Sequence, residues 1–183
     1  MEKLGWRMLE KGLRVLFCSL LLLAFAACSG EEPKPSRLQI GDPAPDFSAT
    51  DLEGQPVSLA AYRGQPVVLR FWSTECKYCR ADTPIFNQYF NKYQERGLRV
   101  VYINRNADEE TVRRFVADLG IVFPVVLDSG GAISASYNIK IEPQTIFLAP
   151  DHTILAAILG GVSEGEFQGL LGKYLANPAG EGE

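Results

Sequence analysis

Two cysteines three residues apart, Cys76 and Cys79, stand where an apolar, β-rich run gives way to a helical pattern. The run at 67–72 predicts a buried strand, and the helical pattern continues to about Arg96, just before Gly97. A helix N-terminus favours an anion because its backbone N–H groups are unpaired, so the first sulfur is expected to ionise readily. The second sulfur lies one helical turn further on, close enough to close a disulfide. The pattern predicts a redox-active dithiol at a strand-to-helix junction.

The same spacing also occurs in zinc sites and in structural disulfides, and it can arise by chance. A zinc site needs four ligands, but no second cysteine pair is present and His152 is the sole histidine. We expect His152 to be a solvated residue of a hairpin loop and not a metal ligand. Redox chemistry is the interpretation adopted here, and it requires no metal and no cofactor beyond the two sulfurs.

The remainder of the chain alternates strand and helix patterns. This order predicts an α/β fold whose first strands are parallel and whose last two form an antiparallel hairpin. Further strands are expected at 98–103, 123–127, 145–148 and 154–159, helices at 106–119, 132–137 and 163–175, and an extra N-terminal β-hairpin within 47–59. Asn106 with Glu109, and Ser163 with Glu166, are interpreted as capping boxes that open two of the helices.

The first 27 residues differ from the rest of the chain. Basic residues precede an apolar run at 15–27, whose 13 residues suit a signal peptide better than a spanning helix of about 20. Phe25-Ala26-Ala27-Cys28 resembles the cleavage box of bacterial lipoproteins, which implies removal of 1–27 and acylation of Cys28. The polar, proline-rich stretch 28–37 is expected to be a flexible tether, and 177–183 a flexible tail.

An uncleaved anchor and ordinary secretion are the alternatives to a lipid anchor. All three place the domain in the cell envelope, outside the cytoplasm, facing the periplasm or the cell exterior. Without 1–27 the chain has 14 basic and 20 acidic residues, a net charge of −6, and no basic run. Nucleic acid is therefore not expected as a partner.

Three segments together resemble the thioredoxin superfamily, and within it the extracytoplasmic TlpA/ResA-like branch, which is related to the AhpC/TSA redoxins. They are Phe71-Trp72-Ser73-Thr74-Glu75-Cys76-Lys77-Tyr78-Cys79-Arg80, Gly41-Asp42-Pro43-Ala44-Pro45-Asp46-Phe47 and Glu142-Pro143-Gln144-Thr145. The resemblance covers 38–176 and implies a thioredoxin-like domain with a central mixed sheet flanked by helices. It also implies a thiol–disulfide oxidoreductase acting on protein thiols and disulfides and supplied by an upstream membrane electron donor. Cytochrome c maturation is a process that this branch often serves.

The resemblance also implies roles for individual residues. Cys76 is expected to attack a partner's disulfide and Cys79 to resolve the mixed disulfide, with Asp82 assisting proton transfer. Pro143 is implied to be a cis-proline that faces the active site. It is expected to bind substrate together with Glu142 and Trp72.

Two residues depart from the family pattern. Glu75 stands where the family usually has Trp, and Glu142 stands where Thr or Val is commoner. Both carboxylates are expected to destabilise the Cys76 thiolate, whereas Lys77 is expected to stabilise it. We expect the acids to prevail, which predicts a reductant.

Two other functions remain open at this point. A peroxiredoxin-like peroxidase uses a Thr-x-x-Cys site, but Thr74 is only two residues before Cys76. A Sco-like copper-handling module uses Cys-x-x-x-Cys with a nearby histidine, and here the cysteine spacing is one residue shorter.

Overall fold

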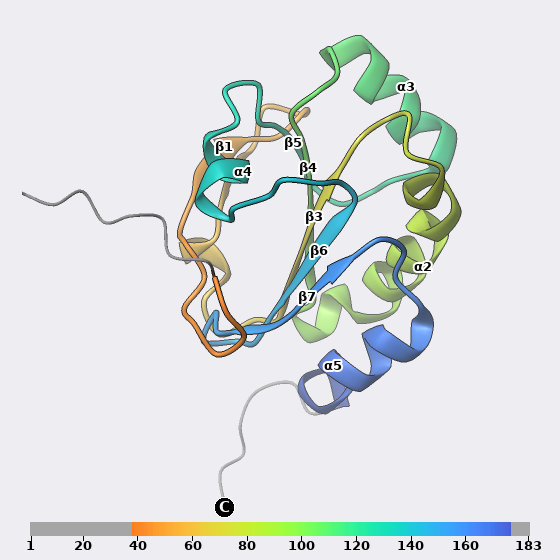
Figure 1. Cartoon of the computed structure of the whole chain (residues 1–183). Coiled ribbons are helices and arrows are strands. Elements are labelled where there is room, and N and C mark those ends of the chain that lie inside the picture. The colour runs from red at the N-terminus through yellow and green to blue at the C-terminus, as the bar shows by residue number, and fades with distance from the viewer. Residues whose placement is uncertain (1–37, 177–183) are drawn as a thin grey trace, which may run out of the picture. The chain divides into compact units, whose positions relative to one another are not determined.

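The computed structural model describes residues 38–176. The predicted signal peptide (1–27), tether (28–37) and tail (177–183) lie outside the described residues. A five-stranded mixed sheet runs through the described part, and helices cover it (Figure 1). The predicted α/β, thioredoxin-like fold is confirmed.

The strands of this sheet follow the order β5-β4-β3-β6-β7. Their bounds are Val67–Trp72 for β3, Arg99–Asn104 for β4, Val125–Leu127 for β5, Gln144–Leu148 for β6 and Ile154–Leu159 for β7. β3, β4 and β5 are parallel, because helical crossovers join them, whereas β6 is antiparallel to both of its neighbours. The expected parallel strands and the antiparallel edge hairpin are both confirmed.

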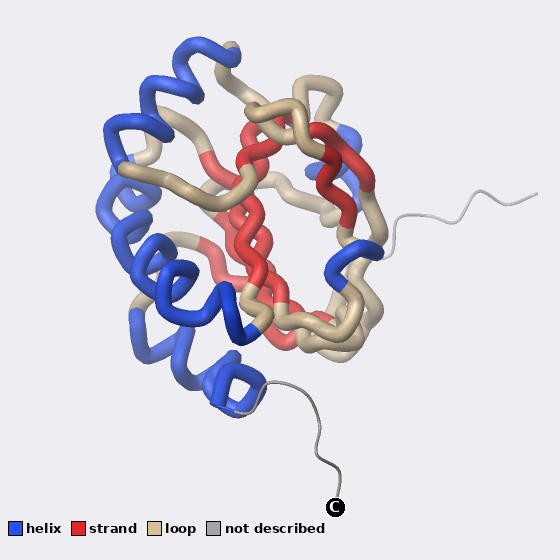
Figure 2. The backbone as a smooth tube through the Cα atoms, turned by 180° about the vertical axis from the view of Figure 1, so that it is seen from behind, coloured by secondary structure: helices blue, strands red, loops and turns tan. Residues whose placement is uncertain are grey.

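Three helices pack on one face of the sheet, and Figure 2 shows them gathered on one side of the strands. They are α2 (Lys77–Tyr93), α3 (Glu109–Leu119) and α5 (Glu164–Ala176). The opposite face is covered by the short helix α4 (Ala132–Ser136) and the predicted N-terminal hairpin of β1 (Ser48–Thr50) and β2 (Pro56–Ser58). Single 3₁₀ turns follow β2 and α2, at Ala60–Tyr62 and Gln94–Arg96. None of the helices within 38–176 is long and apolar enough to span a membrane.

The side chains of β3 alternate between the two faces, as a strand period of two requires. Val67, Leu69 and Phe71 belong to the core under the hairpin and α4. Val68 and Trp72 belong to the core under the three long helices. Every residue of β3 is buried, including Arg70, whose place in the alternation is on the long-helix face. A buried strand thus leads directly into the cysteine motif.

Two helix N-termini test the predicted capping boxes. The one at Ser163 is confirmed, because the Glu166 carboxylate accepts from the Ser163 N–H at 2.7 Å and the Ser163 hydroxyl accepts from the Glu166 N–H at 3.3 Å. The one at Asn106 is wrong, because Asp108 caps α3 and accepts from the Thr111 N–H at 2.9 Å. A short acidic side chain immediately before the helix performs this function directly.

His152 lies in the loop between β6 and β7, as expected, but it is 3% exposed and not solvated. Its backbone has a φ of 67°, and its carbonyl accepts from the Ala44 N–H at 2.9 Å. The chain segment before β1 bonds to the backbone of this loop, so a segment remote in sequence lies against the buried His152.

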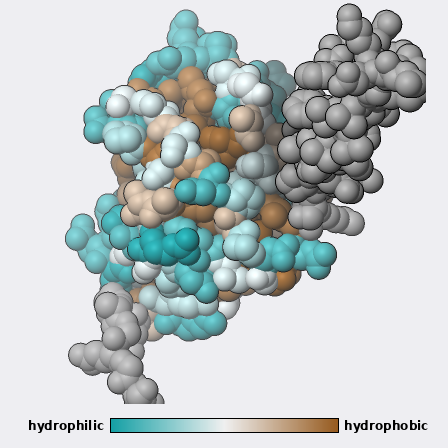
Figure 3. All heavy atoms as spheres, turned by 90° about the vertical axis from the view of Figure 1, so that its left-hand side faces the viewer, coloured by the Kyte–Doolittle hydropathy of each residue, from teal (hydrophilic) through white to brown (hydrophobic). Residues whose placement is uncertain are grey.

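Hydrophobic side chains also reach the surface. Figure 3 shows them gathered in the middle of one face among hydrophilic residues. A groove of about 410 Å³ is lined in part by Ile40, Ile141 and Leu159, each more than 60% exposed. Ile141 immediately precedes the Glu142–Pro143 bond, so the groove begins beside the segment that the sequence assigns to substrate binding.

Candidate active site

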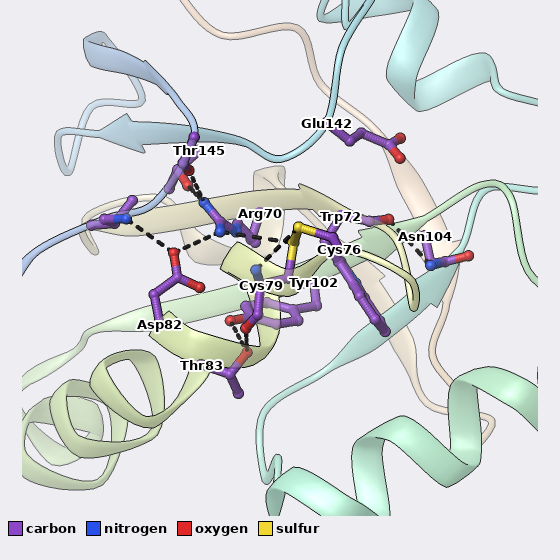
Figure 4. The surroundings of a disulfide bond; sticks show 12 residues. Arg70, Trp72, Cys76, Cys79, Asp82, Thr83, Tyr102, Asn104, Glu142 and Thr145 are labelled. Atoms are coloured by element: carbon purple, nitrogen blue, oxygen red, sulfur yellow. Dashed lines mark hydrogen bonds and ion pairs between the residues drawn. A yellow bond between two sulfur atoms is a disulfide. The ribbon is translucent and has the colours of Figure 1, made fainter.

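Cys76 caps the N-terminus of α2. Its sulfur accepts a hydrogen bond from the Cys79 N–H at 3.1 Å, and its backbone is extended, as at an N-cap. The two cysteines are joined by a disulfide, with their Cα atoms 5.3 Å apart (Figure 4). When this bond is reduced, the same N–H and the helix dipole stabilise a thiolate on Cys76.

The two sulfurs differ in their access to solvent. Cys76 is half-buried, whereas Cys79 is fully buried against the core under the long helices. A partner protein therefore reaches Cys76 first. This asymmetry agrees with the predicted order, in which Cys76 attacks and Cys79 resolves.

Arg70 is the residue of the site that the sequence interpretation missed. Its side chain is fully buried. One guanidinium nitrogen, Nη1, donates to the Thr145 hydroxyl at 2.6 Å and to the Gly160 carbonyl at 3.0 Å. The other, Nη2, lies 2.7 Å from the Asp82 carboxylate and 3.9 Å from the Cys79 sulfur. Figure 4 shows Arg70 between β6, Asp82 and the disulfide.

A signal for Arg70 was present in the sequence. A charged residue inside a run that otherwise predicts a buried strand must find a counter-charge within the fold, because an unpaired buried charge is strongly unfavourable. Arg70 lies two residues before Trp72, so the period of two places it on the same face as Trp72 and towards the helix that follows.

Asp82 lies one turn beyond Cys79 on α2 and is 6% exposed. Its Oδ2 accepts from Arg70 and from the Val162 N–H at 2.9 Å, whereas its buried Oδ1 has no partner among the described residues. Burial raises the pKa of Asp82, and the Arg70 guanidinium opposes that shift. Burial likewise lowers the pKa of Arg70, and Asp82 opposes that shift. Each partner thus opposes the effect that burial has on the pKa of the other.

Glu142 and Pro143 are joined by a cis peptide bond, as the resemblance implied. The Glu142 carboxylate lies 3.0 Å from Arg105 Nε and 2.9 Å from Asn106 Nδ2, and it extends away from the disulfide (Figure 4). Burial raises the pKa of Glu142, and Arg105 opposes the shift. Arg105 thus partly offsets the charge of Glu142, and the predicted effect of Glu142 on the Cys76 thiolate stays a prediction.

Residues 40–157 match the AhpC/TSA family. The chain belongs to this family. It is 31% identical to the thiol-disulfide oxidoreductase ResA of Bacillus thuringiensis over 166 residues, which cover 87% of this chain and 96% of that protein.

Two solved structures resemble the family member described here. The thioredoxin domain of a thiol-disulfide oxidoreductase from Bacteroides vulgatus has a TM-score of 0.67 and 26% identity, covering 75% of this chain and 99% of that one. A secreted disulfide oxidoreductase of Mycobacterium tuberculosis has a TM-score of 0.63 and 29% identity, covering 69% and 95%. With Cys76 and Cys79 disulfide-bonded at the start of α2, these matches show a TlpA/ResA-like thiol–disulfide oxidoreductase of the thioredoxin superfamily.

Three predicted residues have less direct positions in this oxidoreductase. Trp72 is fully buried and packs on Phe115, with ring centroids 4.4 Å apart. Its side chain is therefore part of the core behind the cysteine motif and offers no surface to a substrate. Glu75 and Lys77 flank Cys76 and are both exposed. Water therefore screens their influence on the sulfur, and their predicted tuning of the thiolate stays a prediction.

Metal binding was one of the competing uses of the cysteine pair. Within residues 38–176 no three His, Cys, Asp or Glu side chains are grouped so that they could hold a metal ion. His152 lies in the β6–β7 loop and not in the cysteine motif.

Proposed function

We propose that this oxidoreductase reduces protein disulfides outside the cytoplasm. The observation that carries the proposal is the pairing of a half-buried Cys76 at the start of α2 with a fully buried Cys79 next to the Asp82 carboxylate. The exposed Glu75 and the exposed Lys77 flank Cys76, one acid and one base, and the buried Asp82 adds a second acid one turn beyond Cys79. We take the acids to have the larger effect on the thiolates. Destabilised thiolates favour the disulfide form of the enzyme, which makes the dithiol a reductant.

The cycle proceeds in two exchanges. The Cys76 thiolate attacks one sulfur of the partner's disulfide, and the other partner sulfur leaves as a thiolate that takes up a proton. Cys79 then loses its proton and attacks Cys76 Sγ. The bond between Cys76 and the partner breaks, and the partner leaves fully reduced while the Cys76–Cys79 disulfide forms. A membrane electron donor would restore the dithiol.

The cis-Pro143 segment supplies a docking strand in this proposal. The backbone of Glu142 would pair with an extended substrate, and the ion pair between Glu142 and Arg105 would hold that segment in place. Ile141 and Gln144 flank the bond and line the adjacent groove. An unfolded polypeptide that exposes apolar side chains fits this surface better than a compact folded one.

Insulin reduction, peroxide consumption and copper binding measured side by side test the function. The reduced full chain should reduce insulin disulfides in the presence of dithiothreitol, and it should consume hydrogen peroxide no faster than the free thiol does. Stoichiometric copper binding, or peroxide turnover faster than insulin reduction, would favour the corresponding alternative instead.

The anchor at Cys28 is part of the proposal. The basic start, the apolar run at 15–27 and the lipoprotein-type box support it, and the Mycobacterium tuberculosis relative is described as secreted. Mass spectrometry of the protein isolated from its native membrane should find a diacylated or triacylated Cys28 as the first residue. Recovery of peptides that contain Lys3 or Lys11 would contradict cleavage and favour an uncleaved anchor.

A further inference from the structure

Arg70 makes a contact that charge neutralisation alone does not require. Both N–H groups of Nη1 are engaged, one by the Thr145 hydroxyl and one by the Gly160 carbonyl, so the guanidinium is held between β6 and the turn after β7. Its Nη2 reaches the Asp82 Oδ2 at 2.7 Å and the Cys79 Sγ at 3.9 Å. One nitrogen thus bridges a carboxylate and the buried sulfur of the dithiol.

The position of Arg70 is set by packing on every side. The guanidinium lies over the ring of Phe86, 5.2 Å from its centroid, and β3 holds the backbone between two hydrogen-bonded neighbours. A buried cation held this firmly has little freedom to move when the disulfide opens. It is therefore present beside Cys79 at each stage of the exchange cycle.

We propose that Arg70 is a further functional residue of the exchange reaction, because it stabilises the Cys79 thiolate and so speeds resolution of the mixed disulfide. Cys79 is buried, and burial alone would disfavour the charged sulfur that resolution requires. A guanidinium at hydrogen-bond range offsets that penalty by direct charge–charge attraction. The inference rests on Cys76–Cys79 as the exchanging pair and not on the direction of electron flow.

The other groups around Cys79 are compatible with this role. Asp82 is the one nearby anion among the described residues of β3, α2, β4 and β6 that face the guanidinium, and two donors share its Oδ2. Tyr102, on β4, stays neutral, because burial raises its pKa well above the usual range. Thr83 and Thr145 are uncharged. Cys76, the reaction partner, begins α2 and is bonded to the substrate when Cys79 reacts.

A two-phase reaction with 5,5′-dithiobis(2-nitrobenzoate) separates the two sulfurs. Attack by Cys76 releases one thionitrobenzoate, and attack by Cys79 on Cys76 Sγ releases the second. Cys18→Ser and Cys28→Ser in the full chain remove the other two thiols. A nearby cation typically changes the thiolate fraction about tenfold or more. The opposing change in nucleophilicity offsets roughly 40–50% of that change on a logarithmic scale.

Arg70→Met should therefore slow the second phase about threefold to tenfold at neutral pH and leave the first phase within about twofold. The slowing should disappear at high pH, where Cys79 is ionised in both proteins, and Arg70→Lys should recover part of the rate. A merely structural effect would be independent of pH. A second phase unchanged at every pH, or slowed equally at every pH, would overturn the proposal.

Two control comparisons distinguish loss of the Arg70 charge from a general loss of structure. Arg70→Met leaves the Asp82 carboxylate without its partner, so Arg70→Met is also combined with Asp82→Asn. The double variant has no unpaired charge from this buried pair, and its second phase should be slower than that of Asp82→Asn alone. Arg99→Met, which removes an arginine from the neighbouring strand where it bonds Gln65, should leave both phases alone. Loss of the first phase as well would implicate Cys76 chemistry itself and would count against the oxidoreductase cycle and not only against Arg70.

Discussion

Cys76→Ser should reduce insulin-disulfide turnover by roughly a thousandfold, to the rate of the reductant alone. The nucleophile is lost, and the buried Cys79 cannot substitute for it because its side chain has no exposure to a partner. Cys79→Ser should lower turnover to a similar extent, but by a different route. Cys76 would still attack, and the mixed disulfide would persist because no resolving thiol remains.

Two observables distinguish these variants. Non-reducing gels and mass spectrometry should detect a partner linked to Cys76 in Cys79→Ser and no such adduct in Cys76→Ser. Cys18→Ser is the matched control, since it makes the same chemical change outside the site and should keep full turnover. Adducts on Cys79 in the Cys76→Ser protein would reverse the assigned order of attack.

Arg70→Met should destabilise the oxidised protein by about 3–5 kcal/mol, because it leaves the Asp82 carboxylate buried without a counter-charge. The double change Arg70→Met/Asp82→Leu removes both charges and should recover most of this loss, since paired apolar replacements of a buried ion pair are often neutral or better. Urea denaturation of the oxidised chain measures both, with the disulfide held constant.

An exposed ion pair gives the matched control. On the surface of α3, Arg114 Nη1 lies 2.7 Å from Glu110 Oε1. Arg114→Met should leave the urea midpoint nearly unchanged, because water screens exposed ion pairs. If Arg70→Met were equally mild, or if the double variant were no more stable than the single one, the buried pair would not hold the structure as described.

Local pattern was sufficient to predict most of the fold. The strand at 67–72 and the hairpin strand at 154–159 have the observed bounds, because apolar runs between turn residues define strands by themselves. The disulfide partners also followed from spacing and helix position. These features depend on residues that are neighbours in sequence.

Three of the failures share one physical cause, which is contact between segments remote in sequence. Arg70 bonds to Asp82 across the interface between β3 and α2, and to the Gly160 carbonyl after β7. Neither partner can be predicted from the residues of β3 alone. Glu142 forms an ion pair with Arg105, which follows β4. No sequence pattern indicated this partner, so the carboxylate was expected to be unpaired. His152 is buried in a loop whose backbone bonds to the segment before β1.

The most direct test of the proposed reductant is a redox equilibrium resolved by residue. The full chain is equilibrated with glutathione or dithiothreitol buffers, alkylated, and digested, and the Cys76 and Cys79 peptides are quantified together. We predict that both convert as one two-electron couple, with a potential nearer thioredoxin's, about −270 mV, than DsbA's, about −120 mV. A potential close to that of DsbA would contradict the reductant, and cysteines that failed to convert together would contradict the dithiol exchange itself.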